Sequence, residues 1–346
     1  MKTKKTRLIK VGNVNIGGNS EITIQSMCNT KTKDTEQTIN QIKELEKAGC
    51  DIVRVAVEDM DDALALKKIK ENINIPLVAD IHFDYKLALE SAKYADKLRI
   101  NPGNIGSKDK VKMVVNAAKE RSVPIRIGVN LGSIEKEFKE KFGLTSKAMV
   151  ESAMKHIKIL EYLDFYDIIV SLKASDIKRT VDAYRMISEK IDYPLHLGIT
   201  EAGTAYSGTI KSSIGIGSLL LDGIGDTIRV SLTSNPVDEV RAGIEILKSL
   251  ELRNGPIIIS CPGCGRTKIN LEKITKDVEN SVCHLKKPLK IAVMGCEVNG
   301  PGEASEADIG IAGATDCAVL FKKGKFIRKI EKSSITECLL KEIEKL

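Results

Sequence analysis

The chain has 346 residues, of which 42% are hydrophobic and 29% charged, and its formal charge is +7. This length suits a barrel of about 250 residues followed by a smaller domain. Trp is absent and aromatic residues make up only 4%, which argues against stacking platforms for single-stranded nucleic acid. The basic excess permits an anionic ligand without requiring a nucleic acid, and we expect no nucleic-acid partner.

The amino terminus and the cysteine content predict a cytoplasmic protein. The basic start is followed by a Gly/Asn-rich stretch at 11–20, where a signal peptide would have its apolar segment. No run of about 18 apolar residues occurs, so no membrane span is expected. The eight Cys are mostly unclustered and do not resemble a secreted disulfide framework, which favours a reducing compartment.

Strand-like and helix-like segments alternate along the first 250 residues. A hairpin over 7–16, turning at Gly12 and Asn13, is expected to precede them. The eight predicted strands lie at 22–27, 51–57, 76–82, 97–102, 124–130, 167–173, 194–200 and 226–232. Segments with helical periodicity separate them, which predicts a (β/α)8 TIM barrel. A doubly wound open sheet is the alternative, but eight repeats of near-equal size favour a closed barrel.

Aliphatic and polar side chains alternate along these strands. In the strand at 51–57, Val53 and Val55 share one face and Arg54 lies on the other. Because the aliphatic face must meet the surrounding helices, the polar face is expected to point into the barrel. Five residues, here called the inward cations, share this position: Arg54, Arg99, Arg126, Lys173 and Arg229.

The inward cations predict an anionic substrate at the carboxyl ends of the strands. Buried cations are costly unless paired, and on this face the strands offer only Asp80 as an acidic partner. A single Arg could reach water or join an internal ion pair, but five together favour a ligand with more than one phosphate charge, such as a diphosphate. Further polar residues are expected at the same end: His82, Asn101, Asn130, His196, Thr200, Glu201 and Ser231.

A second, smaller α+β domain is expected after the barrel. The last barrel helix is predicted over 236–250 and a short polar linker over 251–255, so the domains are placed at 1–250 and 251–346. Strands are predicted at 256–261, 289–294 and 309–313. A helix at 271–283, a hairpin turning at Lys323-Gly324-Lys325 and an amphipathic helix from Ser334 complete this domain.

The smaller domain carries a cysteine pattern typical of a metal centre. Cys261 and Cys264 form a C-x-x-C turn, Cys296 lies in a Gly/Pro-rich loop, and Glu303 follows seven residues later. Three thiols and one exchangeable carboxylate favour an iron–sulfur site with one iron open to chemistry. Zinc is the alternative, because Cys283 could complete a four-thiol set. A redox-active dithiol is less favoured, since no thioredoxin-like βαβ unit surrounds the C-x-x-C.

Taken together, the motifs CPGCGR, GCEVNGPGE, ADIHFD, KLRINPGN, LHLGITEAG and TIRVSL resemble the 4-hydroxy-3-methylbut-2-enyl diphosphate synthase family over nearly the whole chain. The resemblance implies one [4Fe-4S] cluster bound by Cys261, Cys264, Cys296 and Glu303. It also implies a TIM barrel followed by a small domain similar to the cluster domain of sulfite and nitrite reductases. The short linker resembles the compact bacterial form of the family.

The reaction implied is the reductive opening of 2-C-methyl-D-erythritol 2,4-cyclodiphosphate to 4-hydroxy-3-methylbut-2-enyl diphosphate, with flavodoxin or ferredoxin as electron donor. The inward cations would hold the diphosphate and stabilise charge on the leaving oxygen. Asp80, His82 and Glu201 are the candidate proton donors or positioning groups at the barrel mouth, and Glu201 is favoured. The runner-up hypothesis is a zinc-stabilised, diphosphate-binding barrel of aldolase or transferase type.

The linker predicts a dimer. The last barrel helix ends at the face opposite the expected active site, and a short linker makes that site hard to reach within one chain. A head-to-tail homodimer, in which one cluster domain caps the partner barrel, resolves this, and the family resemblance implies the same arrangement.

Overall fold

The structure is a computed structural model and describes residues 4–101, 103–282, 285–298 and 305–346. The chain divides into two compact units, Met1–Leu252 and Arg253–Leu346. Among the described residues, no helix is both long and apolar enough to cross a membrane.

The first unit is a (β/α)8 barrel, which confirms the predicted fold. Its parallel strands follow the order β8-β7-β6-β5-β4-β3-β10-β9. A parallel bridge between Val170 and Leu195 joins β8 to the segment entering β9, and thereby links the two ends of this order. The strands are β3 (Thr23–Met27), β4 (Ile52–Ala56), β5 (Leu77–Asp80), β6 (Lys97–Ile100), β7 (Ile125–Asn130), β8 (Ile168–Lys173), β9 (His196–Leu197) and β10 (Thr227–Ile228).

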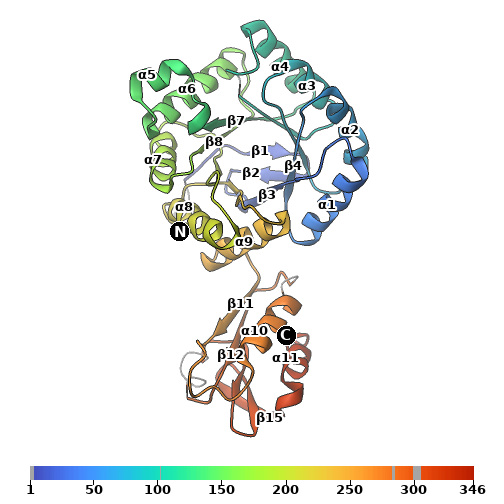
Figure 1. The fold of residues 1–346 in the computed structure, drawn as a ribbon, viewed down its shortest axis with the longest axis vertical. Helices are drawn as coiled ribbons and strands as arrows, with labels where there is room; N and C mark the ends of the chain where they lie inside the picture. The colour runs from blue at the N-terminus through green and yellow to red at the C-terminus, as the bar shows by residue number, and fades with distance from the viewer. Residues whose placement is uncertain (1–3, 102, 283–284, 299–304) are drawn as a thin grey trace. The chain divides into compact units, whose positions relative to one another are not determined.

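Helices surround the strands (Figure 1). They are α1 (Thr35–Lys47), α2 (Met60–Glu71), α3 (Tyr85–Ser91), α4 (Lys108–Glu120), η1 (Leu131–Ser133), α5 (Lys136–Phe142), α6 (Ser146–Tyr162), α7 (Ile177–Ser188), α8 (Ala205–Leu221) and α9 (Pro236–Ser249). Four of them begin after an Asp whose side chain accepts a hydrogen bond from a first-turn N–H, namely Asp34, Asp59, Asp84 and Asp176. Such caps satisfy otherwise unpaired N–H groups and fix where each loop ends.

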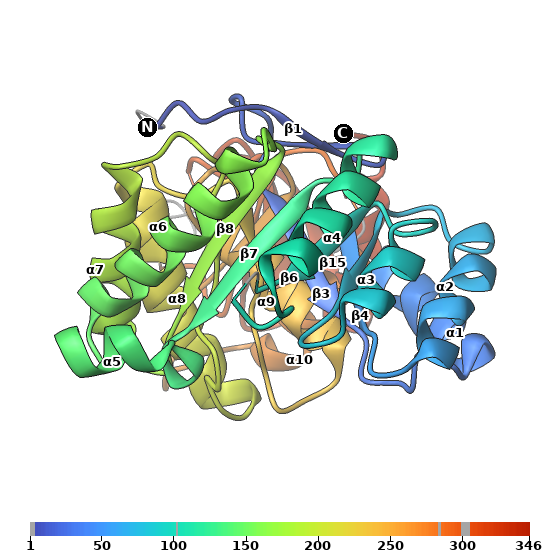
Figure 2. The same cartoon turned by 90° about the horizontal axis from the view of Figure 1, so that it is seen from above.

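The alternation along the strands directs aliphatic side chains towards the helices, as predicted, and a smaller apolar cluster lies inside the barrel. Val53 and Val55 of β4 pack with helix residues such as Leu66 in the large outer core. Ile52, two residues before Arg54, instead packs inside the barrel. There it meets Ile9 and Val11 of the predicted hairpin, β1 (Ile9–Val11) and β2 (Val14–Ile16), which crosses one end of the barrel (Figure 2). The hairpin closes the amino-terminal end, so the polar inward residues occupy the carboxyl-terminal half.

The second unit is a small α+β domain with a five-stranded mixed sheet in the order β11-β12-β13-β14-β15. Its elements are β11 (Pro256–Ser260), α10 (Leu271–Val282), β12 (Leu289–Met294), β13 (Ile309–Gly313), β14 (Cys317–Lys322), β15 (Lys325–Glu331), η2 (Lys332–Ser334) and α11 (Ile335–Ile343). Strands β11, β12 and β13 are parallel, and β14 and β15 are antiparallel. One face of the sheet packs on α10 and α11 through Val278, Ile291 and Leu339.

Candidate active site

The inward cations lie on neighbouring strands inside the barrel. Arg54 is 9% exposed, Arg99 6%, Arg126 1% and Lys173 8%, and the Arg229 side chain is 15% exposed. Arg99 of β6 and Arg126 of β7 stand side by side in the strand register. Strand phase predicted that all five point inward; four of them are buried and Arg229 is half-buried, and their charges converge in one interior region.

Asp80 is the acidic partner of two of these cations. Arg99 Nη1 donates to Asp80 Oδ1 at 3.0 Å, and Arg54 Nε lies 3.6 Å from Asp80 Oδ2. Burial alone would raise the pKa of Asp80, but Arg54, His82 and Arg99 outweigh it and hold that pKa far below its usual value. Asp80 is therefore ionised at neutral pH. An ionised carboxylate can orient the two guanidinium groups but has no proton to donate.

Glu239 is a second carboxylate in this region, and the strand sequences did not indicate it. It lies in the first turn of α9 and is 4% exposed. Its carboxylate accepts bonds from Arg229 Nη2 at 3.2 Å, from Ser26 Oγ at 3.1 Å and from Leu232 N at 3.0 Å. The sequence did contain one signal for Glu239, namely an acidic residue in the first turn of a barrel helix. That turn lies at the carboxyl ends of the strands, where the active site is expected.

Arg126 and Lys173 have no acidic partner among the described residues. Nε and Nη1 of Arg126 also lack any hydrogen bond there. Burial lowers the pKa of both side chains well below its usual value, and neighbouring arginines lower it further. Lys97, which strand phase also places inward, is fully buried with an unbonded Nζ, and sequence reasoning missed it. A bound anion would stabilise the protonated forms of Arg126, Lys173 and Lys97.

The other expected contact residues lie around the same end of the barrel. Asn101 is buried and its Oδ1 accepts a bond from Gly103 N at 3.1 Å, while Asn130, Thr200 and Ser231 are half-buried. His196 is fully buried, and burial followed by Arg126 and Lys173 lowers its pKa well below the usual value, so it is neutral. Glu201 is exposed with φ +52°, and the His82 side chain is 53% exposed.

His156, for which no partner was expected from the nearby sequence, meets a carboxylate in the structure. Its Nε2 lies 2.6 Å from Glu135 Oε1, and Ser152 Oγ donates to Glu135 Oε2 at 2.6 Å. His156 and Glu135 pack against the backbone of Gly103, where an added Cβ would come 2.8 Å from His156 Nε2. This packing supports the turn that follows Asn101.

Two inward glycines make room for the cations. At Gly128 an added Cβ would lie 2.5 Å from Arg99 Nε, and at Gly198 it would lie 2.8 Å from Lys173 Nζ. Gly128→Ala is expected to displace the Arg99 guanidinium from Asp80 and to lower kcat/KM about tenfold, the value of one charge-assisted hydrogen bond. Gly132→Ala is the matched control, because its Cβ would meet nothing within 4 Å. Equal kinetics in the two variants would contradict the role assigned to Gly128.

Lys173 gives a pH prediction. A diphosphate stabilises its ammonium form and so raises the lowered pKa, and we expect binding to take up protons. Substrate affinity should therefore fall as the pH rises through the pKa of Lys173 in the ligand-free protein. For the ligand-free protein, the free energy of unfolding should rise with pH from that lowered pKa towards the ordinary lysine value of about 10.4.

Calorimetry of substrate binding in two buffers of different ionisation enthalpy measures this uptake. Lys173→Met should remove proton uptake, and Lys97→Met serves as the control for the second buried lysine. Identical uptake in wild type and Lys173→Met would refute the assignment.

The cysteine loops follow two neighbouring strands of the second unit. Cys261 follows β11 and Cys296 lies just beyond β12, and Ser260 pairs with Val293 in the parallel register. Gly295 N donates to Cys261 Sγ at 3.2 Å. Cys264 is exposed, and the backbone N–H of Arg266 is the main cause that lowers its pKa. These are features that stabilise a thiolate.

The donors fit an iron–sulfur cluster in chemistry. A backbone N–H already points at one sulfur, and Gly263 and Gly265 leave open space beside the C-x-x-C turn, because an added Cβ would meet nothing within 4 Å. Within the described ranges, no three His, Cys, Asp or Glu side chains are grouped closely enough to bind a single metal ion. Glu303 and Cys283 lie outside those ranges.

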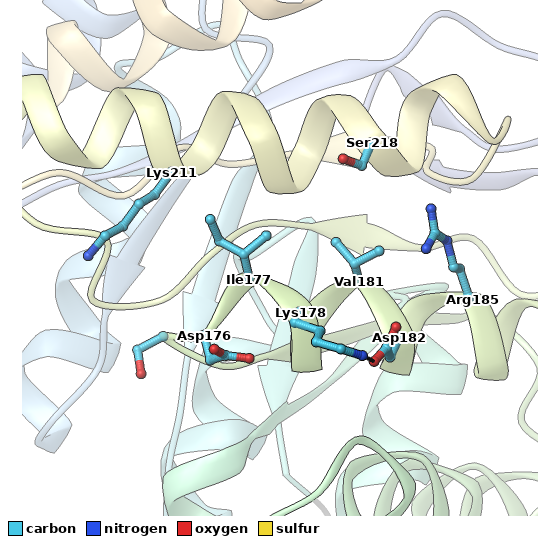
Figure 3. A pocket seen from close by; sticks show the side chains of 9 residues that line it. Asp176, Ile177, Lys178, Val181, Asp182, Arg185, Lys211 and Ser218 are labelled. Carbon is cyan, nitrogen blue, oxygen red and sulfur yellow. Dashed lines mark hydrogen bonds and ion pairs between the residues drawn. The ribbon is translucent and has the colours of Figure 1, made fainter.

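A hollow of about 640 Å³ on the outer surface of the barrel lies between α7 and α8 (Figure 3). Ile177 and Val181 of α7 face α8 across it, and Lys178 bonds to Asp182 at 2.8 Å. It contains none of the inward barrel residues, so it is separate from the cation-lined interior.

Two family models match this chain. Residues 6–244 match the GcpE TIM-barrel domain, and residues 257–345 match the GcpE protein C-terminal domain. A protein from Caldanaerobacter subterraneus subsp. tengcongensis is 61% identical, over 99% of this chain and 98% of its own. One from Clostridium perfringens is 57% identical, over 99% of each chain. Both are named 4-hydroxy-3-methylbut-2-en-1-yl diphosphate synthase (flavodoxin).

Two solved structures show the likeness of the barrel to other folds. Dihydropteroate synthase from Yersinia pestis aligns with a TM-score of 0.52 at 12% identity, over 70% of this chain and 98% of that one. Type I 3-dehydroquinate dehydratase from Clostridium difficile aligns with a TM-score of 0.52 at 16% identity, over 71% and 98%. At such identities the likeness concerns the fold and carries no chemistry.

Proposed function

This chain belongs to the GcpE family, and we propose that it catalyses the reductive ring opening and dehydration of 2-C-methyl-D-erythritol 2,4-cyclodiphosphate. The product is (E)-4-hydroxy-3-methylbut-2-enyl diphosphate, an isoprenoid precursor, and the enzyme is an oxidoreductase. The observation that carries the proposal is the barrel interior, where the five inward cations and Lys97 meet two carboxylates among the described residues.

The inward cations bind the diphosphate. Arg126 and Lys173 lack acidic partners in the described ranges, so they contribute most to binding the diphosphate. Arg54 and Arg99 are pre-oriented by Asp80, and Arg229 by Glu239, so little reorganisation is needed when the substrate arrives. Because diphosphate is also the leaving group, these charges stabilise the negative oxygen that forms as the ring opens.

Polar groups at the mouth orient the rest of the substrate. Asn101, Asn130, His196, Thr200 and Ser231 are the proposed contacts, and neutral His196 can donate or accept a hydrogen bond. The hydroxyl that leaves as water needs a proton, and Glu201 at the barrel mouth is the proposed donor. Asp80 stays ionised, and His82 is placed beside it as a positioning group.

Cys261, Cys264, Cys296 and Glu303 are the proposed ligands of one [4Fe-4S] cluster. When bound, the cluster supplies the two electrons of the reduction one at a time. Flavodoxin is the proposed donor, since the curated relatives carry it in their names, and ferredoxin is the alternative.

The head-to-tail homodimer remains part of the proposal. Helix α9 runs back from the carboxyl ends of the strands, and β11 begins at Pro256, seven residues after α9 ends at Ser249. The linker is short and starts at the closed end of the barrel. This favours a dimer in which each cluster domain acts on the barrel of its partner.

Anaerobic purification tests the function. The expected result is a brown, oxygen-sensitive protein with about four iron and four sulfide per chain that converts the cyclic diphosphate under a strong reductant. A colourless protein with stoichiometric zinc, or turnover that needs no electron donor, would replace this function with the aldolase or transferase hypothesis.

A further inference from the structure

A groove of about 950 Å³ lies in the second unit between the start of α10 and the start of α11. One wall is the segment from Thr267 to Asn270, directly after the C-x-x-C turn, and the other wall comes from η2 and α11. Its apolar lining consists of Ile269, Ile274, Ile335 and Leu340. The groove is open and mixed in polarity, as expected of a surface that receives another protein.

The groove is joined to the cysteine loops by direct hydrogen bonds. Cys264 N donates to Thr267 Oγ1 at 3.1 Å, and Thr267 N donates to Cys264 O at 3.0 Å. Lys268 N donates to the carbonyl oxygen of Gly295, the residue whose N–H bonds to Cys261. The groove therefore begins at Thr267, three residues after Cys264, and its hydrogen bonds connect it through Gly295 to Cys261 and to the residue before Cys296.

The rim of the groove is cationic. Lys268, Lys273 and Lys332 are exposed, and none forms an ion pair within the described ranges. Two acidic residues are among the described residues that line the groove. Glu337 is paired with Lys341 at 2.6 Å, which leaves Asp277 to oppose the lysines. The domain as a whole, residues 253–346, has sixteen Lys and Arg against twelve Asp and Glu.

We propose that this groove is the docking site of the acidic electron-carrier protein, a flavodoxin, that reduces the cluster. The inference rests on the proposed function and locates where the electrons enter. The lysines steer the carrier by its negative surface, and the apolar floor holds it once it has docked. The carrier's redox group would then lie against the Cys264 loop, where it would deliver one electron per encounter to a cluster bound there.

A second cationic surface in the same domain is the alternative. Strand β15 is the exposed edge of the sheet and carries Lys325, Arg328 and Lys329. It is three strands away from β12, which leads to Cys296, and four from β11, which leads to Cys261. Since electron transfer requires close approach to the cluster, the groove beside the cysteine loop is the better docking site.

The test compares two reductants on the holoenzyme. In the triple variant Lys268→Glu/Lys273→Glu/Lys332→Glu, we expect the KM for reduced flavodoxin to rise about tenfold and its salt dependence to weaken or reverse. Turnover driven by dithionite should stay within about twofold of wild type, because none of these lysines belongs to the cluster or barrel sites. The matched control Lys325→Glu/Lys329→Glu should leave both activities unchanged.

Direct binding of flavodoxin, measured by calorimetry, separates this proposal from the proposed function. Groove-dependent affinity in a protein that does not reduce the cyclic diphosphate would support the docking site and reject the function. An unchanged flavodoxin KM and affinity in the triple variant would overturn the docking site, as would an effect confined to the β15 control. Equal losses with flavodoxin and dithionite would also overturn it.

Discussion

Arg126→Met should raise the KM for the cyclic diphosphate roughly 30- to 100-fold without lowering the free energy of unfolding. The affinity loss follows from removing a charge-assisted contact with the diphosphate, worth about 2–3 kcal/mol. Stability should stay the same or increase, because Arg126 is 1% exposed and lacks an acidic partner in the described part of the chain. Replacing a buried, uncompensated cation by an apolar side chain of similar length removes a desolvation cost.

Steady-state kinetics and chemical denaturation of the same preparation check both halves of this prediction. Arg121→Met is the control, because Arg121 is exposed at the end of α4 and should change neither quantity. A variant that binds the cyclic diphosphate as tightly as wild type would remove Arg126 from the substrate site. Loss of stability with unchanged binding would instead indicate that Arg126 has a structural partner.

Cys261→Ser should abolish the cluster and lower turnover by at least on the order of a hundredfold, since even outer-shell changes cost 10- to 100-fold at metal centres. Cys261 follows β11 directly, and its sulfur accepts the N–H bond from Gly295 at 3.2 Å. Serine keeps the size of the side chain but is a poor ligand for iron, so the domain should fold while iron and sulfide are lost.

Iron and sulfide analysis, with the visible absorption of the anaerobic protein, measures this loss. Cys338→Ser is the control, because that thiol lies on α11 outside the cysteine loops and should not affect iron content. Full iron content in Cys261→Ser would exclude Cys261 from the ligand set. Zinc bound in place of iron in the wild type would favour the four-thiol alternative with Cys283.

Much of the barrel follows from local sequence pattern. Each of the eight predicted barrel strands is present in shortened form. The amino-terminal hairpin, α9 and the elements expected after the linker are also present, and β12 and β13 have the predicted bounds. Alternation also predicted which way the side chains point, since Val53 packs in the outer core and Arg54 lies inside. Side chains in a strand repeat every two residues, so one aliphatic face against the helices fixes the opposite face inward.

Contacts between separate segments could not be predicted from the pattern within one strand. Glu239 of α9 contacts Arg229, and Glu135, in the loop before α5, contacts His156. Lys97 shares the phase of Arg99 and was overlooked because it stands at the start of β6, at the boundary of the predicted strand. Edges of elements are the least determined part of a sequence pattern.

Residue type and short-range period are enough to predict the (β/α)8 architecture, the inward cations and the cysteine motif. Which of the cations have an acidic partner depends on tertiary contacts. Asp80 serves Arg54 and Arg99, Glu239 serves Arg229, and Arg126 and Lys173 have no acidic partner in the described ranges. Charge compensation is a through-space property that depends on where separate segments meet and how deeply they are buried, and a strand's own residues do not encode it.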